Sequence, residues 1–132
     1  MADPNETHRV LTVTKTATVA LAAYRTVILS TDTEAVEYPG AQYAWVFGVT
    51  MHAAAIGQPV EVAIMGVVPV QVDGNAANLV AGDGLTAHNG TDGYAQKAAG
   101  AASRAVFGQA LAASTADGDV IPVLLARYLT TA

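Results

Sequence analysis

The chain has 132 residues, a length that fits one folded domain able to bury roughly two thirds of its unfolded surface. Hydrophobic residues make up 52% and charged residues 13%, which excludes a disordered chain. The net charge of −5, with six Lys and Arg residues, argues against a nucleic-acid partner because phosphate neutralisation needs clustered cations. The absence of cysteine excludes disulfides, thiolate chemistry and cysteine-ligated zinc.

The N-terminal segment "MADPNETHR" predicts a flexible polar arm, because it lacks the charged and then apolar order of a signal peptide. The most apolar region, "QPVEVAIMGVVPVQV" at 58–72, is interrupted by Pro, Gly, Glu and Gln. It falls short of the about 18 apolar residues that a membrane helix requires. We therefore expect a soluble protein with no membrane partner.

Strands are predicted along most of the chain. Four threonines at 12, 14, 16 and 18 alternate with other residues, which places them on one face of a leading strand. A second β-branched run follows at 24–30 and ends at the polar "TDTE". Seven further strands are predicted at 43–50, 60–65, 67–72, 85–88, 94–98, 105–111 and 120–128.

Turn signals separate these segments: "YPGA", "AIGQP", "VDGN", "AGDG", "HNGTDG" and "TADGD". Their spacing is typical of an all-β sandwich or barrel and leaves little room for long helices. The alanine-rich "QKAAGAASR" at 96–104 predicts at most one short helix, or a mobile loop. We expect an N-terminal arm and leading strand at 1–16 and a single β-domain at 17–132.

An internal repeat is the most specific pattern in the sequence. The segment "VFGVTMHAAAIGQPVEVAI" at 46–64 resembles "VFGQALAASTADGDVIPVLL" at 106–125 after one inserted residue. The two phenylalanines of the chain, Phe47 and Phe107, become equivalent core anchors. Gly48 and Gly108 mark a bulge or a close approach of backbones. The pattern predicts two similar strand-turn-strand units facing each other in one β-fold.

The stretch "AGDGLTAHNGTDGY" at 81–94 has the residue types of a ligand loop but not the spacing. A calcium loop needs an Asp-x-Asx-x-Asx-Gly run and a terminal glutamate, and a phosphate loop needs a following lysine and helix. Asp-Gly and Asn-Gly instead supply positive φ in tight hairpin turns. We predict turns at Asp83-Gly84, Asn89-Gly90 and Asp92-Gly93.

No catalytic, cofactor-binding or metal-ligating set is predicted. His8, His52 and His88 lie in separate segments without zinc-ligand spacing, and the serines lack a Gly-x-Ser-x-Gly context. One enzymatic alternative stays open, in which two carboxylates of turn-like segments converge in a pocket with perturbed pKa values. The candidates are Glu34, Glu37, Asp117 and Asp119.

The aromatic residues Tyr43 and Trp45 share a face of their predicted strand. Packing in a core or an interface is the favoured interpretation, and stacking on a ligand is the alternative.

The C-terminal half resembles the small capsid cement, or head-decoration, proteins of tailed bacteriophages. Gly82-Asp83 fits the Gly-Asp element of that family, and "FGVTMHAAAIGQPVEVAIMGVVPV" is similar to its middle segment. The likeness covers roughly residues 40–126. The closing element of the family is fitted by Val106, Gly108, Ala110-Leu111, Gly118-Asp119, Ile121 and Val123-Leu124-Leu125.

The resemblance implies a β-barrel-like or β-tulip domain without enzymatic activity. It implies a protein made in the host cytoplasm that joins the exterior of the virion, binds the major capsid protein and stabilises contacts between its subunits as a homo-oligomer, a dimer or trimer. A carbohydrate- or small-ligand-binding β-module of a virion fibre or adhesin, using Tyr43 and Trp45, is the alternative.

The arm and the first strand are the predicted contact with the capsid. Two of the six cations lie there on an otherwise acidic chain, together with threonines that line one strand face. The predicted contact residues are Asn5, His8, Arg9, Thr12, Thr14 and Lys15.

Overall fold

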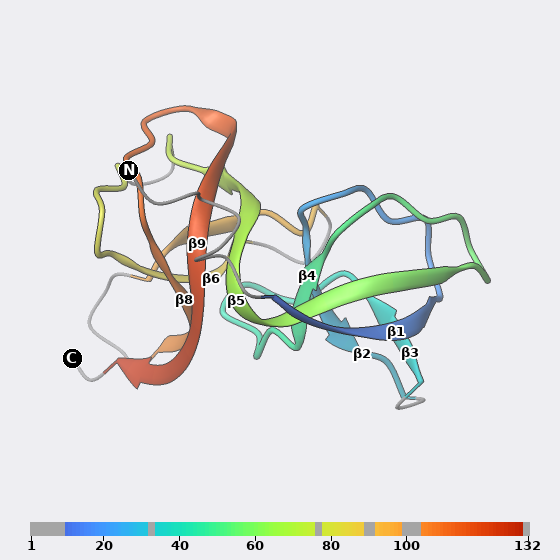
Figure 1. Cartoon of the computed structure of the whole chain (residues 1–132). Coiled ribbons are helices and arrows are strands. Elements are labelled where there is room, and N and C mark those ends of the chain that lie inside the picture. The colour runs from blue at the N-terminus through green and yellow to red at the C-terminus, as the bar shows by residue number, and fades with distance from the viewer. Residues whose placement is uncertain (1–9, 32–33, 76–77, 89–91, 99–103, 131–132) are drawn as a thin grey trace.

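The structure is a computed structural model that describes residues 10–31, 34–75, 78–88, 92–98 and 104–130, and all regular elements among them are β-strands (Figure 1). The prediction of an all-β, barrel-like fold is confirmed. In chain order the strands are β1 Leu11–Ala17, β2 Thr26–Leu29, β3 Ala35–Glu37, β4 Gly48–Thr50, β5 Pro59–Asp73, β6 Gly84–Ala87, β7 Ala95–Lys97, β8 Arg104–Ala110 and β9 Asp117–Thr130.

The nine strands form two closed five-stranded rings that share β5. The first ring runs β1-β3-β2-β4-β5 and closes through the antiparallel β1–β5 pair. The second runs β5-β7-β6-β8-β9 and closes through the antiparallel β5–β9 pair. Figure 1 shows the two rings as two lobes joined by the long β5. Strand β5 was predicted as two strands, but it is continuous, with Gly66 at φ +106° where it passes from one ring to the other.

The two rings are copies of one topology. In the first ring β1 pairs with β3 in parallel and all other pairs are antiparallel; in the second β5 pairs with β7 in parallel and all others are antiparallel. An isolated bridge joins Leu21 to Ala54 in the first unit and Leu79 to Ser114 in the second. The predicted repeat is therefore confirmed, and it extends beyond the matching sequence to the whole described fold.

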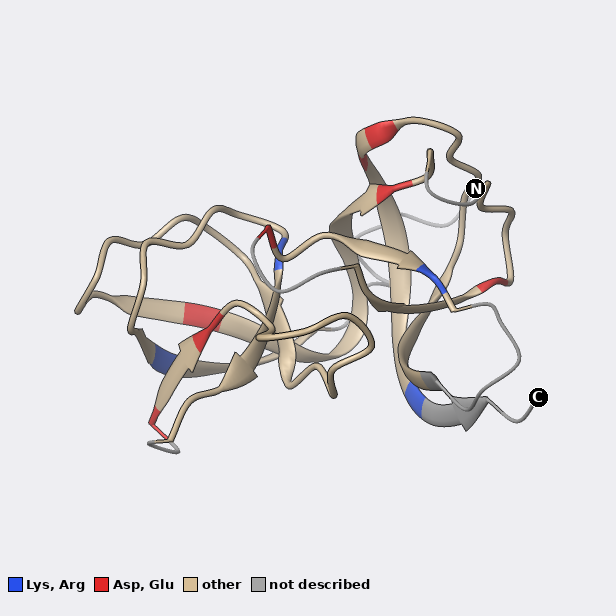
Figure 2. Ribbon diagram, turned by 180° about the vertical axis from the view of Figure 1, so that it is seen from behind, with Lys and Arg blue, Asp and Glu red and all other residues tan. Residues whose placement is uncertain are grey.

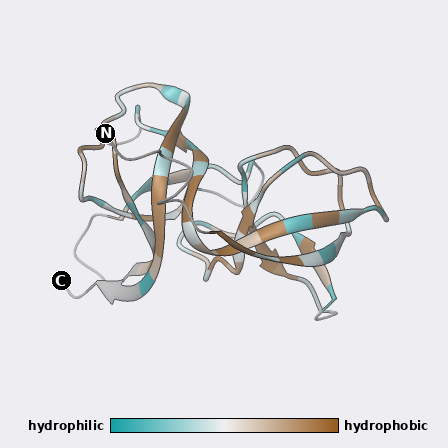
Figure 3. Cartoon of the chain, in the orientation of Figure 1, coloured by the Kyte–Doolittle hydropathy of each residue, from teal (hydrophilic) through white to brown (hydrophobic). Residues whose placement is uncertain are grey.

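Each unit has its own buried core. Val27, Val60 and Val62 are fully buried in the first unit, and their counterparts in the second are Leu85, Ile121 and Val123. The second core also takes in Val46, Val49 and Ala63 from the first unit, so the lobes pack against each other. The hydropathy colouring of Figure 3 shows hydrophobic residues along the shared β5 and along β9.

Arg25 connects the two units through its guanidinium group. It donates hydrogen bonds to the Gln71 side chain (2.8 Å) and to the Asp92 carbonyl (2.6 Å), and it lies 4.6 Å from the centre of the Tyr94 ring. The neighbouring Thr26 donates both its amide and its hydroxyl to the Gly93 carbonyl. The loop after β6 is thus tied to the start of β2.

Several sequence-based boundaries need correction. Residues 43–47 were predicted as strand, but β4 begins at Gly48, because Tyr43 has φ +65°, which no strand accommodates. The short β3, Ala35–Glu37, was not predicted, because its polar flanks read as turns. The predicted helix or loop at 96–104 begins in β7 instead, and its residues 99–103 lie outside the described chain. Among the described residues, no helix is long and apolar enough to cross a membrane.

Candidate interaction surfaces

A polar surface covers the outer face of β1 and the first half of β5. The Thr12 and Thr14 hydroxyls donate hydrogen bonds to the two carboxylate oxygens of Glu61, at 2.6 and 2.7 Å. The Glu61 amide donates to Nε2 of His52 at 3.2 Å. The hydrogen bond from Thr12, then that from Thr14, hold the pKa of the Glu61 carboxyl below its ordinary value of 4.5. The predicted threonine face therefore exists and holds an ionised carboxylate.

The predicted contact residues divide into three groups. Asn5, His8 and Arg9 lie outside the described residues. Thr12 and Thr14 are engaged with Glu61, as above. The Lys15 side chain is only 16% exposed, and its Nζ lies 3.9 Å from the Glu34 carboxylate and 5.7 Å from the centre of the Phe47 ring. Figure 2 shows the few charged residues of the described chain scattered over both lobes.

The corresponding face of the second unit is apolar. Along β5 and β9, Val67 pairs with Leu124 and Pro69 pairs with Pro122. Val120, half exposed, continues this face, which forms a shallow groove of about 190 Å³. The pairing of β5 with β9 is regular at Pro122. The register shift in this pair lies further along, between Val72 and Asp73. The face carries no charge at these positions, and exposed apolar surface of this kind is typical of protein contacts.

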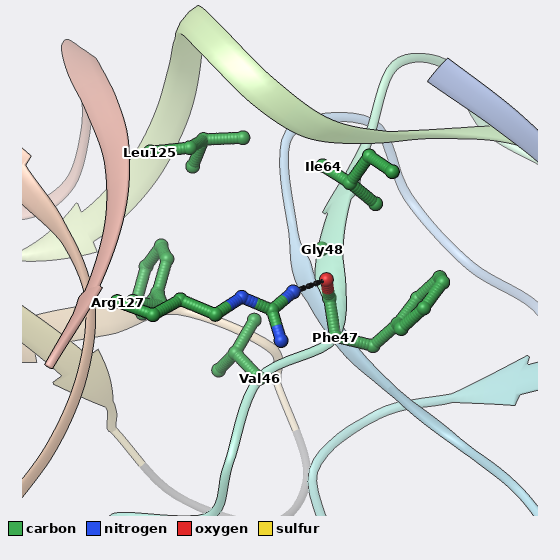
Figure 4. A pocket seen from close by; sticks show the side chains of 7 residues that line it. Val46, Phe47, Gly48, Ile64, Leu125 and Arg127 are labelled. Carbon is green, nitrogen blue, oxygen red and sulfur yellow. Dashed lines mark hydrogen bonds between the residues drawn. The ribbon is translucent and has the colours of Figure 1, made fainter. Parts of the chain in front are cut away.

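A second groove lies where the two units meet. Its volume is about 370 Å³, and Trp45 at its edge is 55% exposed. The Arg127 guanidinium donates a hydrogen bond to the Phe47 carbonyl; Figure 4 shows this bond in a smaller pocket that shares Val46, Phe47 and Arg127 with the groove. The lining residues are Ile28, Leu29, Ala44, Trp45, Val46, Phe47 and Arg127.

The sequence indicated only part of this Trp45 groove. Tyr43 and Trp45 were predicted to share a strand face, which is wrong, because the chain turns at Tyr43 and has no strand pairing through Trp45. The contribution of Arg127 was missed entirely. Nothing in the local sequence indicates that Arg127, near the end of β9, lines the same groove as Ile28 and Leu29 of β2, because the two strands belong to different rings.

The glycine-rich stretch at 81–94 forms turns, as predicted, but in a different arrangement. The Asp92 carboxylate accepts the Tyr94 amide at 2.9 Å around Gly93, which has φ +71°. The Asp83 carboxylate accepts the Val80 amide at 3.0 Å, but the positive φ lies at Gly82 and not at the residue after Asp83. Asn89-Gly90 lies outside the described residues.

The polar groups considered for chemistry are dispersed. Glu37 and Tyr38 line one groove, and the other three candidate carboxylates are not part of its lining. The Asp119 carboxylate instead accepts a hydrogen bond from the Ser114 hydroxyl at 2.8 Å. His88 lies between two carboxylates, with Nε2 3.1 Å from Asp73 and Nδ1 3.3 Å from Asp92. Within the described ranges, no three His, Asp or Glu side chains are grouped in a way that would hold a metal ion.

Comparisons with known proteins identify the class and then the family. The fold is that of the head fiber gp8.5 N base in bacteriophage phi29, with a TM-score of 0.66, 20% identity, and coverage of 89% of this chain and 95% of that one. No curated protein matches the chain in sequence. Residues 5–125 match the phage cement protein family. The chain belongs to that family and is a virion-associated structural protein of a bacteriophage.

Proposed function

We propose that this protein binds the outside of an assembled phage head and stabilises contacts between its major capsid subunits. The observation that carries the proposal is the match of residues 5–125 to the phage cement protein family. The double ring suits this role, because strands closed in rings leave side-chain faces, rather than free sheet edges, to make contacts. Many identical weak contacts on one shell add up through multivalency.

The contact with the shell is proposed to use the arm and the first strand, with Asn5, His8 and Arg9 beside Thr12, Thr14 and Lys15. The described part of this set supports the idea through a polar face on which Glu61 is held ionised by two threonines. Lys15 adds a cation at the boundary between that face and the Phe47 ring. Self-association as a dimer or trimer is proposed on the uncharged β5–β9 face.

The experiment that tests the proposal is co-sedimentation of the purified protein with undecorated, expanded phage shells. We expect the protein to pellet with the shells and to raise the temperature at which they release their DNA. A protein that stays in the supernatant at all shell concentrations would reject the proposal. Sedimentation velocity of the free protein measures its oligomeric state in the same preparation.

A truncation that tests the arm must leave β1 in place, because β1 closes the first ring. Deleting residues 1–16 would remove most of β1, which pairs with β5 from Leu11 to Thr16. Deleting residues 2–9 leaves that pairing intact and removes half of the predicted contact set. We expect this shorter deletion to weaken shell binding at unchanged thermal stability, and full binding would refute a role for the arm.

The alternative, a carbohydrate-binding module, draws support from the exposed Trp45 beside a groove. Recognition of a sugar needs several polar groups that fix its hydroxyls. Apart from Arg127, the side chains that line this groove are apolar. The lining therefore does not favour a sugar in the groove, and the cement function remains the conclusion.

A further inference from the structure

The Trp45 groove is not required by the fold, and the internal repeat shows this directly. Counting back from the equivalent pair Gly48 and Gly108, Trp45 corresponds to Ala105, which is only 8% exposed. Counting on from Ile64 and Leu125, Arg127 corresponds to Gly66. The second ring therefore forms with an alanine where the first has Trp45, and the first ring forms with a glycine where the second has Arg127. The tryptophan and the arginine have a purpose other than building the ring.

The exposed surface of the groove is apolar with a single cation at its border. Trp45 is 55% exposed and Leu29 is 36% exposed, so two of the large apolar side chains that line the groove are open to solvent. Tryptophan and arginine are the residue types most enriched among the anchors of protein interfaces. Their neighbouring positions on one groove indicate a protein contact rather than a chance exposure.

The positive charge of Arg127 indicates that the occupant of the groove carries a negative charge. The guanidinium donates to the Phe47 carbonyl, and no acidic side chain of the described residues lies within ion-pair distance of it. Of the described cations, Lys15 and Lys97 lie near carboxylates and the partly buried Arg25 donates to neutral acceptors, whereas Arg127 combines a neutral acceptor with an exposed position. A guanidinium has five N–H donors and pairs best with a carboxylate of the occupant.

We propose that the Trp45 groove binds an acidic segment of a phage-head protein, with a carboxylate on Arg127 and an adjacent apolar side chain against Trp45 and Leu29. The inference rests on the proposed function, from which it takes the partner, and it adds a second contact beside the first strand. The two contacts are continuous, because Lys15 lies over the Phe47 ring that lines the groove.

The groove can be observed selectively, because Trp45 is the only tryptophan of the chain. We would replace it with 5-hydroxytryptophan, which absorbs at longer wavelength than the tryptophans of the shell, and titrate the labelled protein with undecorated, expanded shells. The expected result is a blue shift of the label and reduced quenching by acrylamide on binding. Label that stays equally quenched in the bound protein would overturn the proposal.

Variants separate this proposal from the proposed function. We expect Trp45→Ala to weaken shell binding at least about tenfold, and Arg127→Gln to weaken it by a similar factor and reduce its salt dependence. Arg127→Lys keeps the charge and should recover part of the affinity. Ile56→Ala, which truncates a side chain that is 69% exposed away from the groove, is the matched control and should bind as the unaltered protein does.

The outcomes are distinct. If the unaltered protein does not bind shells, the proposed function fails, and this inference fails with it. If the unaltered protein binds and Trp45→Ala binds equally well, only the groove is rejected. Thermal unfolding of each variant checks that the fold is retained, and the Arg127→Lys variant preserves the test if Arg127→Gln is destabilised. If anionic oligosaccharides bind to the groove and neutral ones do not, a protein segment is likewise rejected as the occupant.

Discussion

The two units of this molecule have the same strand order, but the outer face of the first is polar and that of the second is apolar. On the first unit, the paired β1 and β5 present Thr12 and Thr14 around the Glu61 carboxylate. On the second, the equivalent pair of β5 and β9 presents Pro69 and Pro122 among aliphatic side chains. Closed rings fix which positions point inward, so the inner positions keep their character while the outer ones diverge. The outer faces are therefore where differences of function are expected.

The glycines at the start of β4 and within β8 test the equivalence of the units most severely. A Cβ at Gly48 would meet the Ala63 carbonyl and lie 2.6 Å from Cγ1 of Val62; one at Gly108 would lie 2.6 Å from Cγ1 of Val123 and 2.9 Å from the Leu124 carbonyl. We expect Gly48→Ala and Gly108→Ala each to lower the free energy of unfolding by about 3 kcal/mol, measured by chemical denaturation.

The matched control for these variants is Gly40→Ala, because an added Cβ there meets no atom within 4 Å. Its free energy of unfolding should stay within about 0.5 kcal/mol of the unaltered protein. A large loss at one of the two equivalent glycines and none at the other would break the equivalence of the units.

Arg25→Ala tests how the units are joined. The change removes two charge-assisted hydrogen bonds and the contact with Tyr94, so we expect a loss of about 2 kcal/mol of stability. Because β5 is shared by both rings, unfolding should remain one transition. Trp45 fluorescence reports the region where the units meet, and far-ultraviolet circular dichroism reports the strands of both units.

Two separated transitions in the Arg25→Ala variant would show that the shared strand does not couple the units. Lys97→Ala is the control, because it removes a half-exposed ion pair with Asp83 within the second unit, for which we expect a loss below about 1 kcal/mol.

The smallest effect is expected on the polar face of the first unit. The folded-state pKa of Glu61 is depressed, so its stabilising contribution is present above its ordinary pKa of 4.5 and is lost as the pH falls through the lowered value. Replacing Thr12 and Thr14 together by valine should raise the pKa of Glu61 toward 4.5. A carboxyl chemical-shift titration by NMR measures this change.

The stability difference between the unaltered protein and this double variant should be present at neutral pH and vanish once Glu61 is protonated in both. A Glu61 pKa that does not change would show that the threonines do not hold the carboxylate in solution.

Much of the fold could be predicted because glycine and aliphatic positions carry the repeat. Gly57 and Gly118 were matched in the sequence, and both have positive φ in the structure. The rest of the duplication could not be found in this way, because equivalent positions can share a backbone conformation without sharing a residue type. Tyr24 has φ +63°, and its equivalent Gly82 has φ +98°. Rings closed by pairing of distant strands leave no local signal.

The candidate surfaces were predictable only where the pattern is local. The alternation of Thr12 and Thr14 along one strand indicated a threonine face, and the structure shows that face. The partner of the threonines, Glu61, lies 47 residues beyond Thr14, and Arg127 lies 80 residues beyond Phe47. Such pairs depend on topology, which sequence patterns of one chain do not specify.

A cryo-electron microscopy map of the decorated head would show how the protein sits on the shell. We expect density for the double ring on the outer surface of the head, with Trp45 and Lys15 turned toward the shell and the β5–β9 face of the second unit turned toward a neighbouring copy. A head exterior without this density, or a bound protein whose Trp45 groove faces solvent, would contradict this expectation.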